Sequence, residues 1–271
     1  MMPIHPADKD VGVSYEEDRQ LVLLADKLGF TEAWMGEHYS STAEPVTSPL
    51  IFNASLIKET QNIKFGTGVI SLPQQHPAVI AGQVSLLDHL SKGRVILGVG
   101  AGGLVSDWEL FGNMDGRSRA ITMIESMEAI LKFWENSENY HYKGEFLDIS
   151  LKKNIIQELG IGKFVKPFQK PYPEIAISLK NPNSMTAKLA GEKGWIPISG
   201  NFVDAKEVLI NGSFENFEIP IRQFYSIYEN LKNAVDASFD YMLILNSGSW
   251  LFDGNLVNKI IAKLQDFTIG C

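Results

Sequence analysis

The glycine-rich segment GRVILGVGAGGL, residues 93–104, could form a ligand-binding loop after a buried β-strand. Gly98, Gly100 and Gly103 match the G-x-G-x-x-G spacing, in which small residues let backbone N–H groups approach a dinucleotide pyrophosphate. That motif needs a helix that begins inside the glycine run and an acidic residue about 20 residues further on, at the end of a second strand. Here the next good helical pattern begins near Arg117, and no acidic residue fits that position. The glycine spacing by itself is therefore weak evidence for a dinucleotide site.

Polar residues that could do acid–base chemistry follow several predicted strands. His38 can move protons near neutral pH, and an equally good interpretation is a strand-end histidine that binds a neighbouring carbonyl. His76 precedes Pro77 at a helix start, which favours a capping role over catalysis. We expect the polar strand ends to surround one cavity. The other members of this set are Glu37, Ser71, the glycine run 98–103, and residues 181–186, 199–201 and 246–249.

Two carboxylates and two tryptophans each have two interpretations. Glu37 and Asp107 could be acid–base groups, although a loop carboxylate is more often exposed and solvated. Trp34 and Trp108 favour packing roles, although either ring could border a flat ligand. The choice between these roles depends on burial, which the sequence does not give.

The composition narrows the class of protein. The chain has 271 residues, of which 45% are hydrophobic and 21% charged, as is typical of a globular protein with a sizeable core. Its formal net charge of −8 argues against nucleic acid or an anionic membrane as a partner, because both attract clustered Lys and Arg. The single cysteine, Cys271, excludes a disulfide framework and a thiolate metal cluster, and we expect no metal site.

The N-terminal sequence MMPIHPADKD lacks the basic region and the apolar run of a signal peptide. In addition, no apolar stretch approaches the ~20 residues that a membrane span needs. We therefore expect a cytoplasmic protein.

The first helix is predicted over residues 14–28. Ser14 and Glu17 form a capping box at its start, and Gly29 ends it. The face that we expect to be buried consists of Leu21, Leu24, Ala25 and Leu28.

Strands and helices alternate along the rest of the chain. Ser48 can cap the helix after the first strand, and Pro49 suits its first turn. The predicted strands are TEAWMGEH (31–38), NIKFGTGVISLP (62–73), RVILGVG (94–100), EIAISL (174–179), WIPISG (195–200) and FDYMLILNSG (239–248). The later helices are predicted at 77–92, 117–134, 184–194, 203–235 and 255–267. Residues 138–173 are expected to be an irregular crossing segment within a single domain, residues 1–271.

Apolar strands that alternate with amphipathic helices are typical of a parallel sheet, and the number of such units favours a (β/α)8 TIM-barrel-like fold of the α/β class. In such a barrel, ligands bind at the carboxyl ends of the strands. That rule directs attention to the polar residues at the strand ends.

Four stretches of the sequence, in their order and at their spacing along the chain, resemble the bacterial luciferase-like flavin-dependent monooxygenases. The resemblance is closest to the limonene and alkane monooxygenase-like branch. They are EAWMGEHY, FGTGVISLPQQHP, QVSLLDHLSKGRVILGVGAGGLVSDWELFG and RSRAITMIESMEAIL. The resemblance covers roughly residues 3 to 200. It implies a β/α barrel that uses reduced FMN to insert one oxygen atom from O2 into a small apolar organic substrate. It also implies a separate flavin reductase that supplies the reduced FMN.

The resemblance also assigns site residues. His38 matches the family histidine at the reactive edge of the flavin and is the expected catalytic residue, since an imidazole can move the protons that oxygen chemistry requires. Tyr39 replaces a second histidine found in bacterial luciferase, so light emission is not implied. Gly68 and Val69 match a pair that often forms a non-prolyl cis peptide under the flavin. The remaining cofactor-binding residues are Gly100, Ala101, Gly102 and Gly103 beside the ring, and Arg119, Asn183, Ser184 and Thr186 at the phosphate.

The sequence also departs from the family pattern. The first strand is reduced to about MMPI, the region after residue 200 is short, and no eighth strand is evident, so we expect a shortened barrel. These departures leave two alternatives open, a non-catalytic flavin-binding relative and a deazaflavin- or nicotinamide-dependent oxidoreductase on the same barrel. Family members commonly form homodimers through the helices after strands two and three, and we expect the same here.

Overall fold

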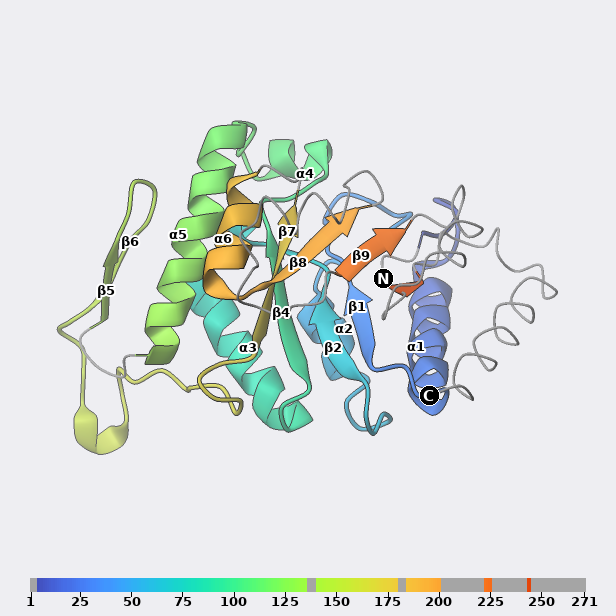
Figure 1. Cartoon of the computed structure of the whole chain (residues 1–271), viewed down its shortest axis with the longest axis horizontal. Coiled ribbons are helices and arrows are strands. Elements are labelled where there is room, and N and C mark those ends of the chain that lie inside the picture. The colour runs from blue at the N-terminus through green and yellow to red at the C-terminus, as the bar shows by residue number, and fades with distance from the viewer. Residues whose placement is uncertain (1–3, 136–139, 180–183, 201–221, 226–242, 245–271) are drawn as a thin grey trace.

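A computed structural model describes residues 4–135, 140–179, 184–200, 222–225 and 243–244 of the chain. Figure 1 shows a curved central sheet with α3, α5 and α6 packed on one side and α1 on another. Both the sheet and its covering helices follow from the alternation of apolar strands with amphipathic helices that the sequence shows.

The main sheet is parallel and wound in sequence order. Its strands are β1 (Glu32–Met35), β2 (Lys64–Thr67), β3 (Ile70–Ser71), β4 (Val95–Gly100), β7 (Glu174–Leu179), β8 (Ile196–Gly200), β9 (Arg222–Tyr225) and β10 (Leu243–Ile244). The order across the sheet is β1-β2-β4-β7-β8-β9-β10, with β3 also paired to β4. Strands that are adjacent in space in the order of the chain define a β/α barrel. The predicted α/β, TIM-barrel-like fold is confirmed, with seven strand positions in the described part of the chain.

Strands β2 and β3 are two parts of one interrupted strand. Phe65 of β2 pairs with Val95, whereas Ile70 of β3 pairs with Val99, so the register against β4 changes by one residue between them. The interruption contains the cis peptide bond between Gly68 and Val69 that the family resemblance implies. A bulge of this kind re-aims the chain at a sheet edge.

The helices are α1 (Val11–Lys27), α2 (Pro49–Ala54), α3 (Pro77–Ser91), α4 (Val105–Leu110), α5 (Gly116–Glu135) and α6 (Met185–Lys193), with short 3-10 turns η1 (Leu72–Gln74) and η2 (Gln157–Leu159). Ser48 caps α2 and His76 caps α3, each followed by a proline, as predicted. The His76 Nδ1 atom accepts the Ala78 N–H at 3.2 Å, which confirms its structural role.

The predicted start of α1 is wrong, and its predicted buried face is only partly right, because Ala25 packs against the hydrophobic core but Leu21 and Leu28 are only half-buried. Asp10, not Ser14, caps the helix, because its carboxylate accepts the Val13 N–H at 2.9 Å. The buried face consists of Ser14, Asp18 and Val22, whereas Leu24 of the predicted face is exposed. A polar pair explains this orientation: the His5 Nε2 atom lies 3.1 Å from the Asp18 carboxylate in the interior.

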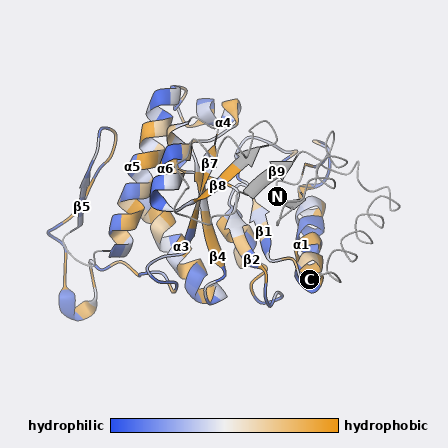
Figure 2. Cartoon of the chain, viewed as in Figure 1, coloured by the Kyte–Doolittle hydropathy of each residue, from blue (hydrophilic) through white to orange (hydrophobic). Residues whose placement is uncertain are grey.

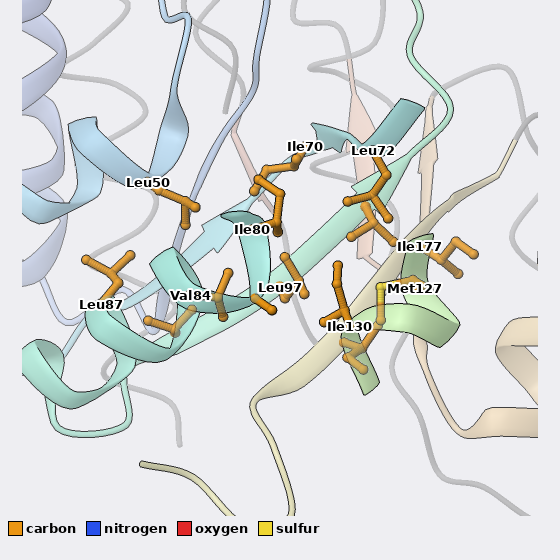
Figure 3. Close-up of a cluster of buried hydrophobic side chains, with 14 of the residues drawn as sticks. Leu50, Ile70, Leu72, Ile80, Val84, Leu87, Leu97, Met127, Ile130 and Ile177 are labelled. Atoms are coloured by element: carbon orange, nitrogen blue, oxygen red, sulfur yellow. The ribbon is translucent and has the colours of Figure 1, made fainter. Parts of the chain in front are cut away.

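Two hydrophobic clusters lie on opposite faces of the sheet, because successive side chains of a strand alternate between faces. The larger cluster fills the space between the sheet and α2, α3 and α5, and Figure 3 shows its members Ile80 and Val84 facing Leu97, with Ile130 beside them. The smaller cluster fills the inner face and consists of Trp34, Ile96, Ala176, Ile196 and Ile198. Figure 2 shows the corresponding hydropathy, with apolar strands inside and polar outer faces on the helices.

Glycines allow the close approach of neighbouring strands at the inner face. A Cβ at Gly66 would lie 2.3 Å from the Trp34 ring, and a Cβ at Gly98 would lie 1.8 Å from the Thr67 carbonyl oxygen. Gly98, the first glycine of the G-x-G-x-x-G match, therefore serves strand packing rather than ligand binding.

The crossing segment, residues 138–173, contains short elements: the antiparallel hairpin of β5 (Tyr140–Lys143) with β6 (Asp148–Leu151), which projects beyond α5 in Figure 1, and the turn η2. Two other segments differ from the sequence-based prediction. Helix α4 directly follows the glycine run, where no helix was expected. Strand β9 lies within 203–235, which was predicted to be helical. In the described residues, no helix combines the length and apolar character that crossing a membrane requires.

Candidate active site

The carboxyl ends of the parallel strands bring most of the predicted site residues to one edge of the barrel. His38 follows β1, Gly68 and Val69 follow β2, and Gly100 ends β4. Ser184 follows β7 and caps α6. Because these strands run in parallel, their carboxyl ends share one edge, which is where barrels of this class bind ligands.

His38 lies between two carboxylates. Its Nδ1 atom is 3.3 Å from Asp107 Oδ2, and its Nε2 atom is 3.3 Å from Glu44 Oε2. The histidine side chain is 14% exposed, and the His38 backbone N–H donates to the Val46 carbonyl at 2.9 Å, which closes the loop of residues 38–46. The imidazole is therefore fixed in place at both ring nitrogens, and it is not the carbonyl-bonded strand-end histidine considered as an alternative.

Asp107 is a buried carboxylate that organises the start of this loop. It accepts the Ser40 N–H at 2.9 Å, the Tyr39 N–H at 3.2 Å and the Ser40 hydroxyl, in addition to the contact with His38. Burial raises the pKa of Asp107, but the hydrogen bonds from Ser40, Tyr39 and His38 outweigh that effect and hold the pKa below its ordinary range. Asp107 is therefore an ionised acceptor and not a solvated loop carboxylate.

Glu37 is buried in a different way. Its carboxylate accepts the Ser71 N–H at 3.0 Å and the Gln75 side-chain amide at 2.8 Å, and the residue is 4% exposed. Burial raises the pKa of Glu37 to about 7, although the hydrogen bonds from Ser71 and Gln75 act in the opposite direction. Glu37 thus connects the end of β1 to β3, immediately after the cis peptide.

The glycine loop is crowded on one side and open on the other. A Cβ at Gly100 would lie 2.6 Å from the Ser178 hydroxyl and 2.7 Å from the Val69 side chain. Gly102 has a φ of +86°, which favours glycine, whereas a Cβ at Gly103 would meet no atom within 4 Å. Ala101 packs against the larger hydrophobic cluster. Gly103 is therefore the position of this loop that borders free space, whereas Gly102 borders the polar side chains of Trp108 and Gln74.

Arg119 is buried at the start of α5 rather than exposed in its first turn. Its guanidinium carbon lies 3.7 Å from the centre of the Trp108 ring, and Nη1 donates to the carbonyls of Asn113 at 2.7 Å and Met114 at 2.6 Å. Trp108 thus stacks on the arginine, and Trp34 packs in the inner cluster as predicted.

Buried polar atoms without a partner gather beside Gly102. Eight such side-chain atoms occur in the described part of the chain, and four of them belong to this one region: Gln74 Oε1, Trp108 Nε1, Asn113 Oδ1 and Arg119 Nε. A Cβ at Gly102 would lie 3.2 Å from Trp108 Nε1 and 3.4 Å from Gln74 Nε2, which places these groups around the loop. Buried polar groups normally have partners, so this cluster has the character of a site for a polar ligand.

The start of α6 offers a second polar group. Ser184 Oγ accepts the Ala187 N–H at 3.2 Å and lies 3.0 Å from Thr186 Oγ1. Backbone N–H groups and hydroxyls at a helix N-terminus favour an anion. Asn183, the third predicted residue of this set, lies outside the described residues, as do all of the predicted strand-end positions after residue 200.

Sequence reasoning missed Glu44, Gln74 and Asn113. Each of them lies in an irregular segment or a short turn, where no periodicity signals which side chains point inward. Among the described residues, no group of three or more His, Cys, Asp and Glu side chains is arranged to hold a metal ion.

At the carboxyl ends of its parallel strands, this barrel places a histidine between two carboxylates and a cluster of unpaired polar atoms. These features define the class of ligand-binding β/α barrels. The sequence profile of the family described as luciferase-like monooxygenase matches residues 1–193. The chain therefore belongs to the luciferase-like monooxygenase family.

The sequences of individual proteins are also similar to this chain. The chain is 46% identical over 112 residues to limonene 1,2-monooxygenase of Rhodococcus erythropolis, an alignment that covers 41% of this chain and 29% of that protein. It is 26% identical to the oxygenase component of flavin-dependent trigonelline monooxygenase of Acinetobacter baylyi, over 93% of this chain and 71% of that protein. The chain thus spans less than a third of the limonene enzyme.

A solved structure shares the fold. The oxygenating constituent of 3,6-diketocamphane monooxygenase from Pseudomonas putida, determined in complex with FMN, superposes with a TM-score of 0.72 at 23% identity. The match covers 83% of this chain and 64% of that chain.

The buried Glu37 predicts a pH dependence of stability. Between its ordinary pKa near 4.5 and its folded-state pKa of about 7, the folded chain keeps a proton that the unfolded chain has lost. Stability that is present at low pH is therefore lost as pH rises, by about 2–3 kcal/mol for this group. In Glu37→Gln, urea unfolding between pH 5 and pH 8 will show a smaller decline than in the parent by about that amount.

The buried Asp18, whose pKa burial raises to about 6, contributes a decline of the same sign to both proteins, so the difference isolates Glu37. Parallel pH profiles of parent and variant would mean that Glu37 is ionised throughout this range.

Proposed function

We propose that the chain is an FMN-dependent monooxygenase that inserts one oxygen atom from O2 into a small apolar organic substrate. The observation that carries this proposal is the placement of His38, held between Asp107 and Glu44, at the same barrel edge as the glycine loop and the unpaired polar atoms beside Gly102. Relatives of the family that are named as flavin-dependent monooxygenases support it.

The residues at this edge fit FMN. A Cβ at Gly102 would enter the cradle formed by Gln74 and Trp108, so glycine keeps this space free. Arg119 keeps an unpaired Nε atom, and a planar guanidinium suits phosphate oxygens. The residues that would hold the ring are Gly68, Val69, Gly100, Ala101, Gly102 and Gly103, and those that would hold the phosphate are Arg119, Asn183, Ser184 and Thr186.

Reduced FMN, when bound, supplies the electrons that activate O2. The chain itself contributes proton handling and exclusion of water. His38 holds or moves a proton at Nε2, since Nδ1 is directed at the ionised Asp107. Trp34 is fully buried in the inner cluster, so water is excluded from the side chains on this face of the sheet.

Apolar side chains beside this edge support an apolar substrate. Phe111 contacts the Tyr39 ring edge-on at a centroid distance of 4.9 Å, next to His38. Other exposed apolar side chains lie nearby along the chain: Val105 and Leu110 on α4, Met114 after it, and Met185 at the start of α6. Side chains of this type favour a small hydrocarbon-like molecule over a charged one.

A separate reductase and a cytoplasmic location complete the proposal. The trigonelline enzyme is named as an oxygenase component, which supports a division of labour between an oxygenase and a reductase in this family. The cytoplasm would provide the reduced nicotinamide that such a reductase consumes.

Helix α3 supports a homodimer. Val79, Leu86 and Leu90 are exposed on one face of α3, and Ile51 is exposed on α2, which packs beside α3. An exposed apolar row of this kind is typical of a surface that a second chain covers.

The direct test of the function is oxygen uptake and product formation with chemically reduced FMN, with alkanes, terpenes and aldehydes as substrates.

His38→Ala will lower product formation at least about ten-fold and change FMN affinity less than a few fold, because proton transfer contributes ~10²–10⁴ in rate. Product analysis together with FMN absorbance titration checks both parts. Oxygenation by the variant at the parental rate contradicts the role of His38, and FMN binding without any oxygenation by the parent identifies a non-catalytic relative.

Arg119→Ala will weaken FMN binding much more than riboflavin binding. The lost charge-assisted contact, of ~1.5–3 kcal/mol, matters only when the ligand carries a phosphate. Fluorescence quenching titrations with both flavins measure the contrast. Equal losses for the two flavins would show that Arg119 acts through its stacking on Trp108 and its bonds to the 113–114 carbonyls.

Leu86→Glu will convert a dimer into a monomer in sedimentation equilibrium, because it places a charge in the apolar row of α3. The matched control is Leu159→Glu, a similar change at another exposed leucine, on η2, which will leave the dimer intact. A monomeric parent protein, or equal effects of both substitutions, contradicts dimerisation through α3.

A further inference from the structure

Glu44 faces the ring nitrogen of His38 that Asp107 leaves available. Its Oε2 atom lies 3.3 Å from His38 Nε2, on the opposite side of the ring from the Asp107 contact at Nδ1. Glu44 therefore lies next to the ring nitrogen at which His38 would hold or move a proton.

Proton counting defines the state of this pair. Asp107 accepts hydrogen bonds from two backbone N–H groups and a hydroxyl, so it is an ionised acceptor and Nδ1 of His38 carries a proton. The Glu44 Oε2 atom lies 3.3 Å from Nε2, within ion-pair distance. Two groups that both lack a proton repel each other at this distance, so the contact favours a proton on Nε2 or on Glu44.

Exposure rises steadily across the three groups. The side chains of Asp107, His38 and Glu44 are 2%, 14% and 24% exposed, respectively. Glu44 is thus the member of the series that reaches water. Burial raises the pKa of the Glu44 carboxyl, while the charge of His38 acts to lower it, so Glu44 is able to take up a proton.

The other titratable groups around His38 do not provide this outlet. Glu37, at the end of β1, accepts hydrogen bonds from Ser71 and Gln75. The Tyr39 side chain is hydrogen-bonded to Glu37, and its ring packs on Phe111. Asp107, from α4, is committed to the backbone of residues 39 and 40. Among the described groups that face the imidazole, Glu44 is the one with both a contact to Nε2 and access to solvent.

The loop that carries Glu44 is fixed from outside the site. The Tyr15 hydroxyl donates to the Pro45 carbonyl at 2.6 Å, and the His5 N–H donates to the Ala43 carbonyl at 2.7 Å. The Glu44 N–H itself donates to the Ser41 hydroxyl at 3.1 Å. These bonds hold the backbone on both sides of residue 44, so the Glu44 carboxylate is positioned without the aid of a ligand.

We propose that Glu44 is a positioning residue that holds the transferable proton of His38 at Nε2 and exchanges it with solvent. A proton passes from Nε2 to Oε2, which conserves the charge of the pair, and then from Oε2 to a solvent water, which lowers that charge by one. Uptake is the reverse. The catalytic consequence rests on the proposed function, whereas the pairing of Glu44 with His38 is a property of the chain without flavin.

The first test is an NMR titration of the His38 ring nitrogens in the flavin-free protein. Glu44→Gln will move the midpoint of the His38 titration to lower pH, because the carboxylate that favours the protonated ring is gone. The matched control is Glu109→Gln, which removes the same charge from an exposed position on α4 and will leave the midpoint unchanged. Equal midpoints in parent and Glu44→Gln overturn the proposal.

A second variant covers the case in which the glutamine side chain disturbs the loop. In Glu44→Ala, added acetate will restore the midpoint toward that of the parent, and an absence of rescue overturns the proposal. In the oxygenation assay, Glu44→Gln will shift the acidic limb of the pH profile of kcat with little change in FMN affinity. Failure of the parent to oxygenate any substrate refutes the proposed function, and the titration in flavin-free protein still decides the role of Glu44.

Discussion

The arrangement of the candidate active site depends on one buried carboxylate, that of Asp107. It binds the backbone of Tyr39 and Ser40 and the imidazole of His38, so a single side chain of α4 holds the loop after β1 in position. A buried charge is tolerated because several donors replace the water that it has lost. Removal of Asp107 would take the acceptor from the Tyr39 and Ser40 N–H groups and from His38 Nδ1, and the loop would lose the contacts that orient His38.

The glycine run shows how one motif serves different physical needs. Gly98 lets two strands approach, Gly100 avoids Ser178 and Val69, and Gly102 adopts a positive φ beside unpaired polar groups. Gly103 alone borders open space in the part of the loop that the structure describes. The spacing that suggests a dinucleotide fingerprint therefore arises mainly from strand packing inside a barrel, and a pattern match could not separate these causes.

The sequence predicted the features that follow from periodicity and local capping. The alternation of strands and helices, the caps of Ser48 and His76, and the barrel class all depend on patterns of apolar residues and on prolines. The buried face of α1 was not predictable in this way, because it is set by the pairing of Asp18 with the distant His5. Glu44 was missed for the same reason: its partner His38 meets it through loop geometry that no period encodes.

The inner hydrophobic cluster limits the side from which a ligand could reach the candidate site. Trp34 lies across Gly66 and is fully buried, and Ile96, Ala176, Ile196 and Ile198 fill the space around it. These side chains leave no room for a ligand among them, so a ligand of the candidate site would meet the chain at the carboxyl ends of the strands. On the proposed function, flavin and organic substrate would share this one edge, and the residues that border it would select both of them.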